Sequence, residues 1–127
     1  MNKFIEIEPS DDIAKKNQWL VDCRQKNMPY VVVNLRGKTA EVEWDYISYP
    51  MGAEKQFEQK ESCLRAECQK IYDKYSTKGS TFSISASVVN FSGFSIQDAK
   101  VAAEEIFDLV EKLINSKACE LQSTSLG

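Results

Sequence analysis

The chain begins with a short stretch of period two followed by a stretch of helical period. Residues 4–8 alternate apolar and acidic side chains and end at Pro9, a pattern typical of a strand with one wet face. Over residues 13–27 the apolar positions recur at helical spacing. Capping side chains precede them at Ser10, Asp11 and Asp12. A first strand and a first helix are therefore predicted.

The next segment has the pattern of a β-hairpin. Residues 30–35 form a β-branched run that is apolar on both faces, and residues 36–38 separate it from residues 39–47. The second strand has a strict period of two, with Ala40, Val42, Trp44 and Tyr46 on one face and Glu41, Glu43 and Asp45 on the other. We expect Val42, Trp44 and Tyr46 to be buried and the three acidic side chains to face away from the core.

Helical and strand-like patterns also alternate in the second half. Apolar residues within 53–75 keep helical offsets amid mixed charge, which predicts a long helix. Residues 81–91 alternate again and predict a fourth strand. A third helix is predicted from Ile96, because Ser95 and Asp98 resemble a capping box and the apolar residues that follow step by threes and fours.

The predicted order of elements is β-α-β-β-α-β-α, which indicates an α+β fold. It favours an antiparallel four-stranded sheet with helices packed on it, a ferredoxin-like plan with an added C-terminal helix. In that plan the strand order is four, one, three, two, and the first two helices cover the same face. The loss of periodicity after Lys117 predicts one domain over residues 1–117 and a frayed tail over residues 118–127. Other α+β topologies stay open.

Composition and charge exclude several partners. The chain has 127 residues, and 16 Lys and Arg against 19 Asp and Glu give a net charge of −3, so no basic excess favours nucleic acid or an anionic membrane. No signal peptide or membrane-spanning run is visible. The chain has four cysteines without C-x-x-C spacing, which argues against a zinc or iron–sulfur site; they are Cys23, Cys63, Cys68 and Cys119. Because no signal peptide is visible, we expect a cytoplasmic location and four reduced thiols.

Histidine is absent, which removes the commonest general base and every imidazole metal ligand. The sequence also contains no nucleophile motif and no cofactor motif. We therefore predict no catalytic residue, no metal and no cofactor, although paired carboxylates leave an acid–base enzyme conceivable.

Two acidic surfaces are the main candidate sites. If the first and third strands are neighbours, one sheet face carries the carboxylates of Glu6, Glu8, Glu41, Glu43 and Asp45. The third helix places another set on one face, namely Glu104, Asp108 and Glu111. Both sets also fit ordinary solvated faces. Tyr49 and Phe94 are candidate aromatic anchors for a partner.

These surfaces favour a small acidic cytoplasmic protein that occludes a basic protein partner, as an immunity protein, an antitoxin or an anti-defence inhibitor does. A ligand-sensing or scaffolding module with a ferredoxin-like sheet is the alternative, and an enzyme is the third possibility. The sequence does not determine the oligomeric state.

Overall fold

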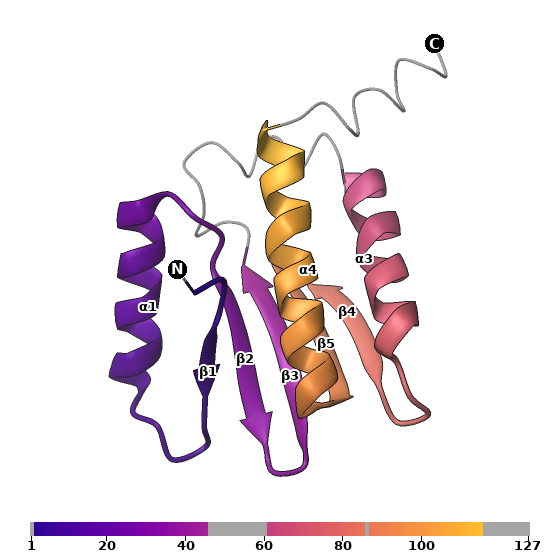
Figure 1. Cartoon of the computed structure of the whole chain (residues 1–127), viewed down its shortest axis with the longest axis horizontal. Coiled ribbons are helices and arrows are strands. Elements are labelled where there is room, and N and C mark those ends of the chain that lie inside the picture. The colour runs from indigo at the N-terminus through magenta and orange to yellow at the C-terminus, as the bar shows by residue number, and fades with distance from the viewer. Residues whose placement is uncertain (1, 46–60, 86, 116–127) are drawn as a thin grey trace.

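A computed structural model describes residues 2–45, 61–85 and 87–115. Strands and helices alternate along this part of the chain (Figure 1). The elements are β1 (Ile5–Ile7), α1 (Ile13–Lys26), β2 (Val31–Arg36), β3 (Thr39–Asp45), α3 (Glu61–Tyr75), β4 (Thr81–Ser85), β5 (Val88–Ser95) and α4 (Ile96–Asn115). Several predictions fall outside the described residues. They concern Tyr46, Tyr49, Cys119, residues 53–60 and residues 118–127.

The strands form one mixed sheet, so the α+β class is confirmed while the details of the sheet differ from the prediction. The described strands number five rather than four, in the order β1-β2-β3-β5-β4. β1 pairs with β2 in parallel, and the other pairs are antiparallel. β2 therefore separates β1 from β3, because the crossover through α1 returns the chain to the strand position beside β1.

The predicted single strand over residues 81–91 is a hairpin. β4 and β5 pair antiparallel, with Phe82 opposite Phe91 and Ile84 opposite Val89. Because the alternation of small and apolar residues continues through the turn, no local sequence pattern predicts it. Val89 therefore lies on the same face of the sheet as Phe82.

A β-bulge in β5 follows this hairpin. Val42 of β3 pairs with Phe91, whereas Ala40 pairs with Phe94, so β5 has one extra residue between these positions. Gly93 lies there with a φ of +80°, and a Cβ atom on it would come within 2.8 Å of the Gly79 carbonyl oxygen. The bulge places Phe91 and Phe94 on the same face of the sheet.

Helices cover both faces of the sheet. α3 and α4 pack on the face of Phe91, where Tyr72 of α3 contacts the Phe91 and Phe94 rings. α1 lies on the opposite face, because its Lys16 pairs with Glu43, which alternates with the buried Val42. The prediction that the first two helices share a face is therefore wrong. Because β1 and β2 pair in parallel, the helix α1 that connects them lies on the face of the sheet opposite to α3 and α4.

The helix ends match the sequence pattern. Asp12 is the N-cap of α1 and accepts a hydrogen bond from the backbone N–H of Ala14. Asn27 ends the helix in the left-handed conformation, with a φ of 54°. Ser95 accepts a hydrogen bond of 3.2 Å from the backbone N–H of Asp98, as the capping box requires.

One part of the core lies between the sheet and the helices α3 and α4, and on the other face Trp19 and Cys23 of α1 are buried. Val42 and Trp44 are fully buried, which confirms the predicted faces of β3. Consecutive valines of β2, Val31–Val33, are also fully buried, because β2 is covered by α4 on one face and by α1 on the other. In the described part of the chain, no helix is long and apolar enough to cross a membrane.

One prediction about the cysteines, that all four are reduced, is wrong. Cys23 and Cys68 are free thiols with no exposed surface, and burial raises the pKa of each to about 12. Cys63 is disulfide-bonded, so the prediction of four reduced thiols is wrong at this position. Cys63 is half-buried on α3, and helical spacing gives no information about which distant residue approaches it.

Candidate functional site

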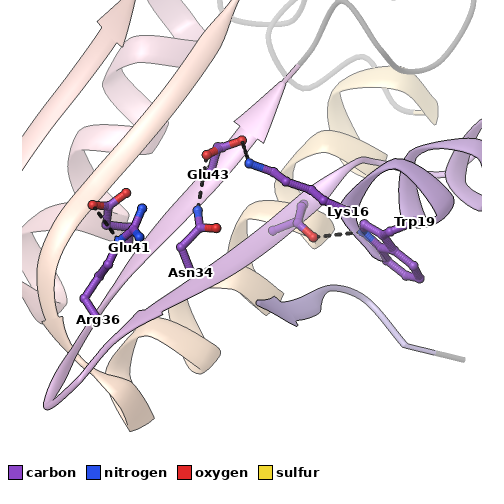
Figure 2. Close-up of polar contacts among 7 residues, drawn as sticks. Lys16, Trp19, Asn34, Arg36, Glu41 and Glu43 are labelled. Atoms are coloured by element: carbon purple, nitrogen blue, oxygen red, sulfur yellow. Dashed lines mark hydrogen bonds and ion pairs between the residues drawn. The ribbon is translucent and has the colours of Figure 1, made fainter. Parts of the chain in front are cut away.

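The acidic side chains of β3 each have a partner within the chain. Glu43, in the centre of the strand, lies 3.1 Å from the Lys16 ammonium group of α1 and accepts a 3.2 Å hydrogen bond from the Asn34 amide of β2 (Figure 2). Asn34 is only 5% exposed. The middle carboxylate therefore connects α1 to the sheet and satisfies a buried amide.

The two flanking carboxylates are paired as well. Glu41 lies 3.4 Å from the Arg36 guanidinium group beyond the hairpin turn (Figure 2). Asp45 accepts a 3.0 Å hydrogen bond from the hydroxyl group of Ser87, which is buried. All three carboxylates are half-buried and face away from Trp44, as predicted, but they form internal pairs on this face rather than an unpaired acidic surface.

The acidic residues of β1 do not join this group. Glu6 pairs with Val33 in the sheet register and forms a 3.0 Å ion pair with Lys100 of α4, so it lies on the other face. Glu8 is exposed beyond the end of β1. The predicted five-carboxylate surface is therefore wrong, because β2 lies between β1 and β3 and the parallel register directs Glu6 towards α4.

The acidic residues of α4 do come together. Glu104, Asp108 and Glu111 are exposed, at positions that share one face of the helix. Lys3 lies among them, with its ammonium group 2.9 Å from Asp108. This hydrogen bond raises the pKa of Lys3, and the charges of Asp108, Glu104 and Glu111 act in the same direction.

A depression borders this acidic face. Its volume is about 490 Å³, and its charged lining residues are Lys3, Glu6, Lys15 and Glu104. Three of these four are already paired: Lys3 with Asp108, Lys15 with Asp11, and Glu6 with Lys100. Glu104 has no ion-pair partner within 4.0 Å among the described residues. We name Glu104, Asp108 and Glu111 the α4 acidic face.

Phe94 is not available as an anchor for a partner. It is fully buried, and its ring lies 5.6 Å from the ring of Phe91 and 5.7 Å from that of Tyr72. The bulge at Gly93 turns it into the core. The prediction that Phe94 is an anchor for a partner is therefore wrong.

Sequence reasoning missed a polar cluster between α3 and α4. Glu105 accepts hydrogen bonds from the Lys74 ammonium group and from the Tyr75 hydroxyl group. This contact, and desolvation after it, raises the pKa of Tyr75 to about 12. The cluster fixes the end of α3 against α4. Because Tyr75 and Glu105 are 30 residues apart in the sequence, no local pattern predicts their contact.

Among the described residues, no three His, Cys, Asp or Glu side chains are placed to hold a metal ion. The α4 acidic face presents negative charge to solvent next to the depression.

Comparisons with protein-family models, with curated proteins and with solved structures found no match.

Proposed function

We propose that the protein binds a basic protein partner through the α4 acidic face and acts by covering a basic site on that partner. The single observation that supports this is the difference between the two acidic groups. The β3 carboxylates are used in internal pairs, whereas Glu104 and Glu111 are exposed and form no ion pair in the described part of the chain. Such charges favour encounter with a cationic surface.

The depression beside Glu104 adds a place where one cationic side chain of the partner can enter. A lysine or arginine inserted there would meet a carboxylate with no competing ion pair. It would also lie near Lys3, whose charge Asp108 neutralises in part. Electrostatic attraction would then speed association, and this inserted side chain would contribute to affinity.

An inhibitor of the immunity-protein, antitoxin or anti-defence kind works in this way, and we include that class in the proposal. A cytoplasmic location is part of it. The disulfide at Cys63 does not support this location, because disulfides are rare in the reducing cytoplasm.

The experiment compares two double charge reversals in complex formation. The partner is first recovered from the native host with the tagged protein, and its association rate is then measured by surface plasmon resonance at low and high salt. The test variant carries Glu104→Lys and Glu111→Lys. The control carries Glu8→Lys and Asp73→Lys, which are also exposed and change the net charge equally.

The proposal expects the test variant to associate at least about tenfold more slowly at low salt, with the difference shrinking as salt screens the charges. The control should stay close to the original protein. Equal slowing in both variants would assign the effect to net charge rather than to this face, and no slowing in either would also contradict the proposal. Recovery of a small metabolite instead of a protein would favour the ligand-sensing alternative.

A further inference from the structure

The two edge strands of the sheet differ in how they are protected. β1, at one edge, is three residues long and ends close to Pro9. Charged side chains next to and within it, Lys3 and Glu6, are held by ion pairs to α4. Short length, charge and proline are the usual devices that prevent an edge from pairing with another chain.

β4, at the other edge, has none of these devices. Its five residues, Thr81–Ser85, include no charged residue and no proline, and its register with β5 is regular. β5 is its only sheet neighbour among the described strands (Figure 1). In the described part of the chain, no strand pairs with the outer side of β4, so its outward backbone groups have no ladder partner there and can pair with a further strand.

The side chains of β4 complement a second copy of β4. In an antiparallel pair centred on Ser83, Thr81 faces Ser85 of the other copy and Phe82 faces Ile84. The hydroxyl side chains of Thr81, Ser83 and Ser85 are exposed on one face, and Phe82 and Ile84 are half-buried on the other. Thr–Ser pairs and pairs of aromatic with β-branched residues are favourable across strands.

Two-fold symmetry allows this pairing while keeping the polar face and the apolar face of each strand on the same sides of the joined sheet. A dyad perpendicular to the sheet through Ser83 pairs only residues that share a face, so polar residues meet polar residues and apolar residues meet apolar residues. No like charges meet, because the strand carries none. We infer that the protein forms a homodimer in which two β4 strands pair antiparallel about Ser83 and join the two sheets.

The first experiment measures mass by sedimentation velocity on the full chain, from about 10 µM to about 1 mM, a range suited to a small interface. The inference expects the average mass to rise towards that of a dimer. A monomer at every concentration overturns it.

Charge substitutions at Ser83 then locate the interface. Because its side chain is exposed, Ser83→Lys should leave the fold intact, which circular dichroism verifies. On the dyad the two new ammonium groups face each other, so the dissociation constant should rise at least about tenfold. Ser10→Lys, the same substitution at an exposed position away from β4, should leave dimerisation unchanged. Equal behaviour of the two variants overturns the inference.

Mixing two variants tests the dyad itself. Ser83→Lys and Ser83→Glu should each dimerise weakly alone, whereas their mixture brings opposite charges together and should form a heterodimer at least about tenfold tighter than either alone. A mixture no tighter than the separate variants overturns the pairing about Ser83. Neither outcome depends on the partner proposed for α4.

Discussion

The Asn34 amide donates a 3.2 Å hydrogen bond to the Glu43 carboxylate across the β2-β3 pair, on the face where α1 packs. Since Asn34 is buried, this carboxylate is a structural acceptor, and Lys16 of α1 balances its charge at 3.1 Å. A residue that looks like part of an acidic surface is therefore needed for the attachment of a helix to the sheet.

The first prediction separates Glu43 from its neighbour on the same strand. Glu43→Ala leaves the Asn34 amide without its acceptor, so the free energy of unfolding should fall by about 2 kcal/mol. Glu41→Ala removes the same kind of side chain from the same face, but its partner Arg36 is exposed, so the loss should stay within about 0.5 kcal/mol. Urea denaturation measures both. Equal losses would show that the hydrogen bond to Asn34 has no special weight.

The second prediction concerns the bulge in β5. Gly93→Ala combines a positive φ with a Cβ atom 2.8 Å from the Gly79 carbonyl oxygen, so it should destabilise the fold by about 3 kcal/mol. Gly37→Ala is the matched control, because Gly37 has a φ of 76° and no atom near its Cβ position. It should cost about 1 kcal/mol. Thermal unfolding of the two variants tests this difference, which would vanish if the Gly79 backbone moved away freely.

The third prediction is that the free energy of unfolding depends on pH through the hydroxyl group of Tyr75. Its folded pKa of about 12 lies above the ordinary value of 10.0, so the neutral hydroxyl group stabilises the folded state. This contribution is complete below about pH 10 and is lost as the pH rises towards about 12.

Tyr75→Phe isolates this contribution from other groups that titrate in the same range. The variant should be less stable than the original protein at neutral pH, by about 1 kcal/mol, because Glu105 loses a hydrogen bond. The difference between the two proteins should shrink between about pH 10 and about pH 12. Urea denaturation across this range measures it, and a difference that stays constant with pH would contradict the role of the Tyr75 hydroxyl group.

The fourth prediction concerns thiol reactivity. Cys23 and Cys68 are buried and their pKa values are about 12, so both accessibility and thiolate content are low in the folded protein. At about pH 8, alkylation of each should be at least about tenfold slower in the native protein than in urea. Mass spectrometry of the labelled peptides gives the two rates. Rapid labelling of the native protein would show that these helices open readily.

Local chemistry was enough to predict several features from the sequence. The alternation in β3 determined that Val42 and Trp44 are buried while Glu43 faces away, because successive side chains of a strand point to opposite faces. A helix cap among Ser10, Asp11 and Asp12 was predicted because capping is a local interaction, and the structure assigns it to Asp12. The α+β class followed from the order of such segments.

Contacts between distant parts of the chain determine which carboxylates are free. Glu6 faces Lys100 because β1 pairs in parallel with β2, and Glu43 is engaged because the crossover brings Lys16 of α1 over the opposite face. Phe94 is buried because an extra residue at Gly93 changes its face. Each outcome depends on contacts between residues far apart in the chain, whose energies come from packing and loop closure rather than from local pattern. The sequence thus determined which residues are acidic and on which face of their own element they lie, whereas the α4 acidic face became distinct only once the fold had paired the others.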